Sequence, residues 1–187
     1  MKKFQNKRRL FKKSMKKLLL LIGGVIMYAL TLYSPDFHEK ISIEQVYPAC
    51  GGENISPELI WENAPKNTKS FAITMFDPDA PTDHGWWHWM VVNIPVSVNK
   101  FPKDAGNPES EYFNLGFQTV NDYGEIGYGG PCPPPGKPHR YIITVYALDV
   151  PGFEIDRNIN PQVLAEAIES HTIDKASIMG YYARGWR

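Results

Sequence analysis

Titratable and aromatic side chains are concentrated in residues 77–88. These twelve residues contain three carboxylates, two imidazoles and two indoles. An apolar run at 70–76 precedes them and another at 89–94 follows, and both are rich in the residue types that favour strands. Polar, titratable groups at the ends of apolar strands are typical of a small anion-binding or catalytic pocket.

A second cluster begins with the glycines and prolines of residues 129–136 and continues to His139 and Tyr141. Backbone N–H groups near Gly130 and Cys132 are free to form a small anion-binding nest. The loop lacks the Gly-Lys-Ser/Thr of a nucleotide-binding loop, so it does not indicate nucleotide hydrolysis.

The start of the next predicted strand carries two further donors. His139 and Tyr141 are two residues apart, so they face the same way, and both can donate a hydrogen bond to a phosphate. Arg140 faces the other side, where we expect a structural salt bridge.

Asp77 and Asp79 lie in a turn made rigid by prolines. Either carboxylate alone is equally well explained as an acceptor of backbone N–H groups that ends the strand. Inside an anion pocket, an aspartate is tolerated if it orients and charges an imidazole, or if burial raises its pKa so that it is protonated.

His88 opens a strand with aromatic neighbours. Strict alternation puts Trp86 and His88 on one face of this strand. Trp87 and Trp89 then fall together on the opposite face. We interpret His88 as a ligand-binding group and Trp86 as an apolar wall, while a structural histidine and a core tryptophan are the alternatives.

Charge is distributed unevenly along this chain of zero formal net charge. Nine of the 20 Lys and Arg residues lie in residues 1–17, so that 11 remain against 20 acidic residues in 18–187, a net charge of about −9. An acidic folded part is a poor candidate for a nucleic-acid partner.

An uncharged apolar stretch, residues 18–33, follows the basic run. This order is typical of an export signal or a short signal anchor, and a buried core helix is the alternative. We therefore predict an N-terminal signal or membrane anchor at 1–34 and one domain at 35–187, exported across the inner membrane and either membrane-anchored or periplasmic or extracellular.

Cys50 and Cys132 are the only cysteines. In an exported domain an even count indicates a disulfide between them. Two separate buried thiols are the alternative.

The rest of the pattern is mainly β. We expect strands at 41–46, 59–61, 70–76, 88–94, 141–148 and 176–182, and long ordered loops at 95–138. One helix is expected after Asn160 and Pro161, with an apolar stripe formed by Val163, Leu164, Ala167 and Ile168. Many short strands and one or two peripheral helices favour a β-sandwich-like fold.

Several ordered motifs resemble the phosphatidylethanolamine-binding protein (PEBP) family, in its bacterial Raf-kinase-inhibitor-like branch. They lie at residues 77–81, 85–93, 127–134 and 139–141, with supporting segments at 50–57 and 147–149. The similarity covers roughly residues 41–187.

The resemblance implies a large antiparallel sheet packed on a smaller one, with small helices at the edge. It also implies a pocket for phosphate-like anions and phospholipid head groups. We expect no cofactor. The implied ligand-binding residues are Asp77, Asp79, Pro81, Trp86, His88, Gly130, Cys132, Pro134, His139 and Tyr141.

Three functions compete on these grounds. The first is a non-enzymatic binding protein for a phosphorylated small molecule or a phospholipid head group. The second, supported only by the family, is an inhibitor or regulator of a kinase or protease. The third is a metal-assisted hydrolase that uses the same aspartates and histidines together with Asp83 and His84.

Overall fold

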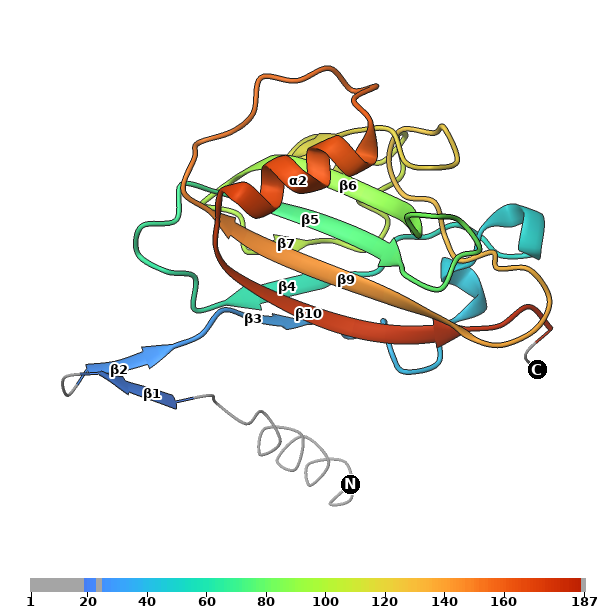
Figure 1. Ribbon diagram of the computed structural model, residues 1–187, viewed down its shortest axis with the longest axis horizontal. Helices are drawn as coiled ribbons and strands as arrows, with labels where there is room; N and C mark the ends of the chain where they lie inside the picture. The colour runs from blue at the N-terminus through green and yellow to red at the C-terminus, as the bar shows by residue number, and fades with distance from the viewer. Residues whose placement is uncertain (1–18, 23–24, 186–187) are drawn as a thin grey trace.

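Two antiparallel sheets make up most of the computed structural model, which describes residues 19–22 and 25–185 (Figure 1). The larger sheet has the order β10-β9-β5-β6-β8, and the smaller has the order β3-β4-β7. The large sheet contains β5 (Ser70–Asp77), β6 (Trp86–Pro95), β8 (Phe117–Gln118), β9 (His139–Leu148) and β10 (Thr172–Tyr182). The small sheet contains β3 (Thr31–Tyr33), β4 (Leu59–Glu62) and β7 (Lys100–Phe101). The mainly β prediction, with a large and a smaller sheet, is confirmed.

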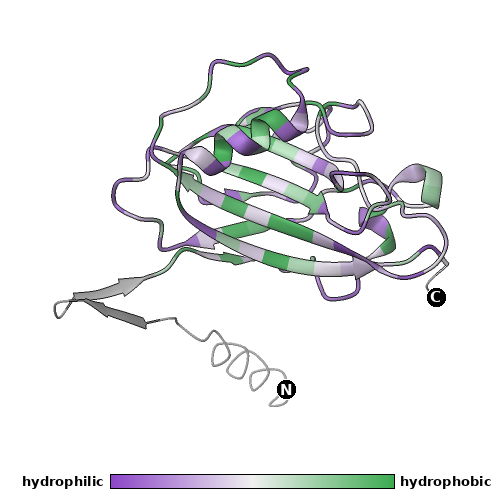
Figure 2. Cartoon of the chain, viewed as in Figure 1, coloured by the Kyte–Doolittle hydropathy of each residue, from purple (hydrophilic) through white to green (hydrophobic). Residues whose placement is uncertain are grey.

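The main hydrophobic core lies between the two sheets. Trp61 and Phe101 of the small sheet pack in one cluster with Ile73, Met75 and Trp89 of the large sheet, and all five side chains are essentially fully buried. The central strands β5, β6 and β9 are apolar along most of their length and are buried on both faces (Figure 2). This packing holds β5, β6 and β9 side by side and so fixes where their ends meet.

Helix α2 (Pro161–Ser170) covers the opposite face of the large sheet (Figure 1). The Asn160 side chain caps the helix by accepting from the backbone N–H groups of Gln162 and Val163, as predicted. The predicted stripe is wrong at Val163, which is 55% exposed, because Ala165 rather than Val163 joins Leu164 against the sheet.

The strand predicted at 41–46 is wrong. A 3₁₀ helix, η1 (Ile43–Gln45), occupies this segment, and a turn bond from the Val46 N–H to the Ile43 carbonyl closes it. Ile41 and Val46 are buried whereas Ile43 is 54% exposed, so the alternation of residue types did not correspond to alternating burial. Two further 3₁₀ helices, η2 (Pro48–Cys50) and η3 (Phe113–Leu115), lie in loops.

Strand β6 contains an extra residue at His88, at one of the two register shifts in its pairing with β5. Met75 pairs with Trp89 and Phe76 pairs with Trp87, so His88 has no partner residue on β5. Such a bulge breaks the two-residue alternation. Trp87 therefore packs towards α2 while Trp89 packs in the core between the sheets, and the prediction that they share a face is wrong.

The apolar N-terminal segment forms strands. β1 (Leu19–Ile22) pairs with β2 (Val25–Tyr28), and β3 pairs with β4, so the small sheet includes residues before the boundary predicted at 34/35. In the described part of the chain, no helix has the length and apolar character needed to cross a bilayer. The basic run at 1–17 lies outside the described residues.

Candidate functional site

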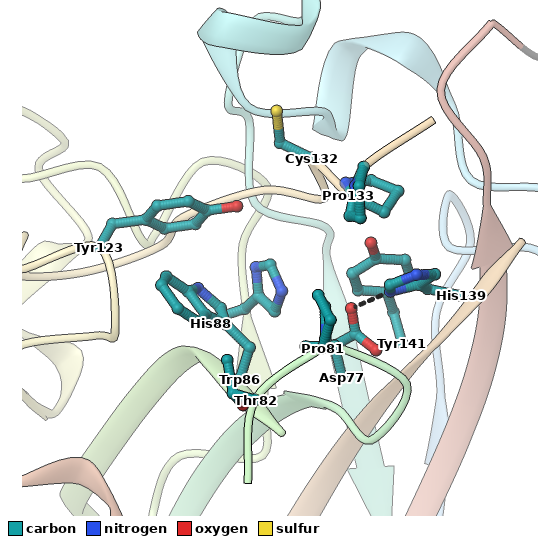
Figure 3. A pocket seen from close by; sticks show the side chains of 12 residues that line it. Asp77, Pro81, Thr82, Trp86, His88, Tyr123, Cys132, Pro133, His139 and Tyr141 are labelled. Atoms are coloured by element: carbon teal, nitrogen blue, oxygen red, sulfur yellow. Dashed lines mark hydrogen bonds and ion pairs between the residues drawn. The ribbon is translucent and has the colours of Figure 1, made fainter. Parts of the chain in front are cut away.

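The ends of β5, β6 and β9 and the loop after β8 enclose a cavity of about 220 Å³ (Figure 3). It lies at the end of the large sheet where the predicted polar clusters meet. Its lining residues are Asp77, Ala80, Pro81, Thr82, Trp86, His88, Tyr123, Cys132, Pro133, Pro134, His139 and Tyr141.

A buried carboxylate–imidazole pair forms one side of the cavity. Asp77 is 3% exposed; its Oδ2 lies 2.8 Å from Nδ1 of His139, and its Oδ1 accepts from the Asp79 N–H. The carboxylate therefore orients an imidazole, which is one of the two arrangements expected for an aspartate in an anion site.

His88 faces this pair across the cavity. Its Nδ1 lies 2.6 Å from the carbonyl oxygen of Gly129, whose N–H in turn donates to the His88 carbonyl. Burial lowers the pKa of His88 to about 4, although the Gly129 carbonyl and the Asp77 carboxylate act in the opposite direction. The imidazole is therefore neutral at pH 7.

Two donors in the cavity wall lack partners. The Tyr141 hydroxyl and the Trp86 Nε1–H are buried, and among the described residues neither has a partner within normal hydrogen-bond geometry. The Asp77 carboxylate lies close enough to the Tyr141 hydroxyl to interact with it, but outside that geometry. Burial, followed by the nearby Asp77 carboxylate, raises the pKa of Tyr141, so the phenol keeps its proton. A buried donor without a partner is costly, which makes both groups candidates for hydrogen bonds to a bound molecule.

Aromatic rings pack around these polar groups. His88 makes edge-to-face contacts with Tyr141 and Tyr123, with ring centroids 5.1 and 5.6 Å apart. Trp86 contacts Tyr123 in the same way, and the Tyr123 hydroxyl donates to the Gly130 carbonyl. Burial raises the pKa of Tyr123, so its hydroxyl also remains protonated.

A disulfide closes the rim of the cavity. Cys132 is joined to Cys50 at the end of η2, which confirms the predicted pair. The bridge ties the proline-rich loop that begins at Cys132 to a segment 82 residues earlier in the chain.

Eight of the ten predicted site residues line this cavity, and Asp79 and Gly130 do not. Both carboxylate oxygens of Asp79 bind the Arg140 side chain, as expected for a structural salt bridge of Arg140. The Gly130 N–H donates to Asn54, so the predicted free N–H at this position is wrong. A Cβ at Gly130 would overlap the Gln45 carbonyl oxygen, which explains glycine there.

Four lining residues were not predicted: Ala80, Thr82, Tyr123 and Pro133. Three of them are next to predicted site residues in the sequence, so this proximity could have been used to predict them. Tyr123 lies in an irregular loop whose local pattern carries no such signal.

Of the six groups proposed for a metal-assisted hydrolase, Asp77, His88 and His139 line the cavity and the other three do not. Asp83 and His84 are exposed at the loop tip, and Asp79 is occupied by Arg140. Within residues 19–22 and 25–185, no three His, Cys, Asp or Glu side chains come together in an arrangement that would hold a metal ion.

Comparison with known proteins identifies the family and the fold. The sequence profile described as phosphatidylethanolamine-binding protein matches residues 33–183. The chain belongs to the phosphatidylethanolamine-binding protein family. Its relatives include the YbhB protein of Escherichia coli, 39% identical over 147 residues that cover 78% of this chain and 93% of YbhB. YbcL of Escherichia coli is 42% identical over 148 residues, covering 77% and 81% of the two chains.

Solved structures of PEBP relatives share the architecture. The crystal structure of Escherichia coli YbcL, described as a new member of the mammalian PEBP family, superposes with a TM-score of 0.79 and covers 82% of this chain and 98% of that one. The PEBP homologue CT736 of Chlamydia trachomatis gives 0.69 at 33% identity, covering 82% and 97%.

Proposed function

We propose that this PEBP-family protein is an exported, non-enzymatic binding protein whose cavity holds the phosphate-like group of a small molecule or of a phospholipid head group. The observation that carries the proposal is the pair of buried, unpartnered donors, Tyr141 and Trp86, in the cavity wall. A phosphate oxygen accepts from both, and the rest of the cavity holds imidazoles rather than an activated nucleophile.

Calorimetry with phosphoethanolamine tests this proposal. A hydrogen bond to a charged group contributes about 1.5–3 kcal/mol, so Tyr141→Phe should weaken binding roughly 10- to 150-fold. The same change should leave the free energy of unfolding equal or slightly higher, because it removes a buried hydroxyl without a described partner.

Tyr146→Phe is the matched control. Tyr146 lies on the same strand but faces α2, where its hydroxyl meets Thr74 at 3.3 Å. Its removal should leave the affinity unchanged. Equal affinity of wild type and Tyr141→Phe would contradict the proposal.

Export is the second part of the proposal. A basic run followed by an apolar segment and a disulfide in the folded domain support it, since disulfides persist in oxidising compartments. Fractionation of cells that express the full chain should recover it outside the cytoplasm or with the membrane. Recovery in the cytoplasmic fraction alone would refute this part.

A further inference from the structure

The hydrogen bond between His88 and Gly129 fixes which atom His88 presents to a ligand. A carbonyl oxygen can only accept, so at 2.6 Å the hydrogen lies on Nδ1 of the ring. Since the ring is neutral at pH 7, its Nε2 then carries a lone pair. His88 therefore meets a ligand as an acceptor, not as a donor.

The other groups around the cavity give it a definite pattern of donors and acceptors. From β5 comes the Asp77 carboxylate, and from β9 come His139, which binds that carboxylate, and the Tyr141 hydroxyl, which lies near it. Trp86 adds the Nε1–H donor, and the Tyr123 hydroxyl is occupied by a backbone carbonyl. No Lys or Arg is among the lining residues of this cavity.

This pattern suits one protonation state of a phosphate ester. A singly protonated monoester carries one P–OH donor, which matches the lone pair of His88, and two further oxygens for Tyr141 and Trp86. The fully ionised monoester has no proton for His88 and brings a second negative charge towards Asp77. A phosphodiester has the single charge but no P–OH.

We propose that the cavity selects phosphate monoesters in their monoanionic form, with the P–OH donating to Nε2 of His88, and discriminates against phosphodiesters. The inference rests on the proposed function and narrows its ligand class. An intact phosphatidylethanolamine head group is a diester, whereas phosphoethanolamine and phosphatidic acid are monoesters.

Calorimetry with methyl phosphate and dimethyl phosphate tests the inference on the wild-type protein. The second pKa of a phosphate monoester is about 6, so its monoanion falls from about 90% at pH 5 to about 3% at pH 7.5. The apparent affinity for methyl phosphate should therefore fall about 30-fold over this range. Circular dichroism at each pH confirms that the protein stays folded.

Dimethyl phosphate is the control because it is a monoanion at both pH values. The ionisable groups that line the cavity with His88 are Asp77, His139, Tyr123 and Tyr141, and dimethyl phosphate reports any effect of pH on the protein itself. Dimethyl phosphate should bind at least about 10-fold more weakly than methyl phosphate at pH 5. Equal affinity for the two compounds, or an affinity for methyl phosphate that is constant or rises with pH, would overturn the inference while leaving the proposed function intact. If neither methyl phosphate nor dimethyl phosphate binds, both the inference and the proposed function are overturned.

A variant and a spectroscopic measurement test the role of His88 separately. His88→Gln places an amide where the ring stood, and its NH₂ can turn to donate, so the pH dependence for methyl phosphate should flatten. Nitrogen-15 NMR of the wild-type ring at pH 7 should show hydrogen on Nδ1 and none on Nε2, and the opposite tautomer would refute the inference even if the variant does not fold.

Two monoesters from different sources extend the test. Phosphoethanolamine represents a free small molecule, and a short-chain phosphatidic acid below its micelle concentration represents a lipid. The inference is supported if phosphoethanolamine or the phosphatidic acid binds with the same pH dependence as methyl phosphate. It is refuted if short-chain phosphatidylethanolamine, a diester, binds more strongly than both of these monoesters.

Discussion

Reduction of the Cys50–Cys132 disulfide should lower the stability of the domain substantially. The bridge closes a loop over a sequence separation of 82 residues. The chain-entropy model assigns such a loop a stabilisation of about 4.5 kcal/mol at 25 °C, which is an upper value. In a domain of this size each kcal/mol shifts Tm by about 2–4 °C, so full reduction should lower Tm by up to about 9–18 °C.

Thermal and urea unfolding with and without a thiol reductant measure the effect. The double variant Cys50→Ala/Cys132→Ala is the control: it should unfold close to the reduced wild type and should not respond to reductant. A change in Tm below about 2 °C on complete reduction, verified by thiol counting, would refute the reasoning, because it would mean that the bridge adds little to contacts already made by the rim.

Three further predictions concern single residues. Asn160→Ala should lower the free energy of unfolding by about 1 kcal/mol in urea titrations, since it removes the cap of α2, and an unchanged midpoint would contradict this. Arg140 lowers the pKa of Asp79 from 3.8 to about 2, so this carboxylate stabilises the fold above about pH 4 and the stabilisation is lost as the pH falls towards 2. Asp79→Asn should remove about 1 kcal/mol of that acid-dependent stability, allowing for solvent screening. Equal acid unfolding of the wild type and the variant would refute this prediction. His88 has its pKa lowered from 6.5 to about 4, so its contribution is complete above about pH 6.5 and falls by an amount on the order of 3 kcal/mol as the pH decreases towards 4. Urea unfolding of wild type and His88→Gln at pH 7 and pH 4.5 should show the steeper loss in the wild type, and parallel losses would be inconsistent with a neutral buried ring.

The sequence predicted the parts of the fold that depend on regular patterns. The strands near 70–76, 88–94 and 141–148 were found because buried strands carry continuous β-branched and aromatic runs, and α2 because Asn160 and Pro161 mark its start. The segment at 41–46 was misassigned because residue types alternated there while burial did not.

The site was predictable where its residues follow a strand and unpredictable where they depend on distant contacts. His139 and Tyr141 share a face because β9 is regular. The bulge in β6 arises from its pairing with β5, and the bond from the Gly130 N–H to Asn54 joins residues 76 positions apart. The local sequence predicts neither of these contacts, and it does not predict that Tyr123 packs against Trp86 and His88.

The extra residue in β6 separates the ligand-facing position from the repeat that builds the core. Because His88 has no partner on β5, the pairs that Trp87 and Trp89 form with β5 do not include this position. The core and the cavity therefore use different residues of one strand, and the side chain that lines the cavity is not one of those that set the register between β5 and β6.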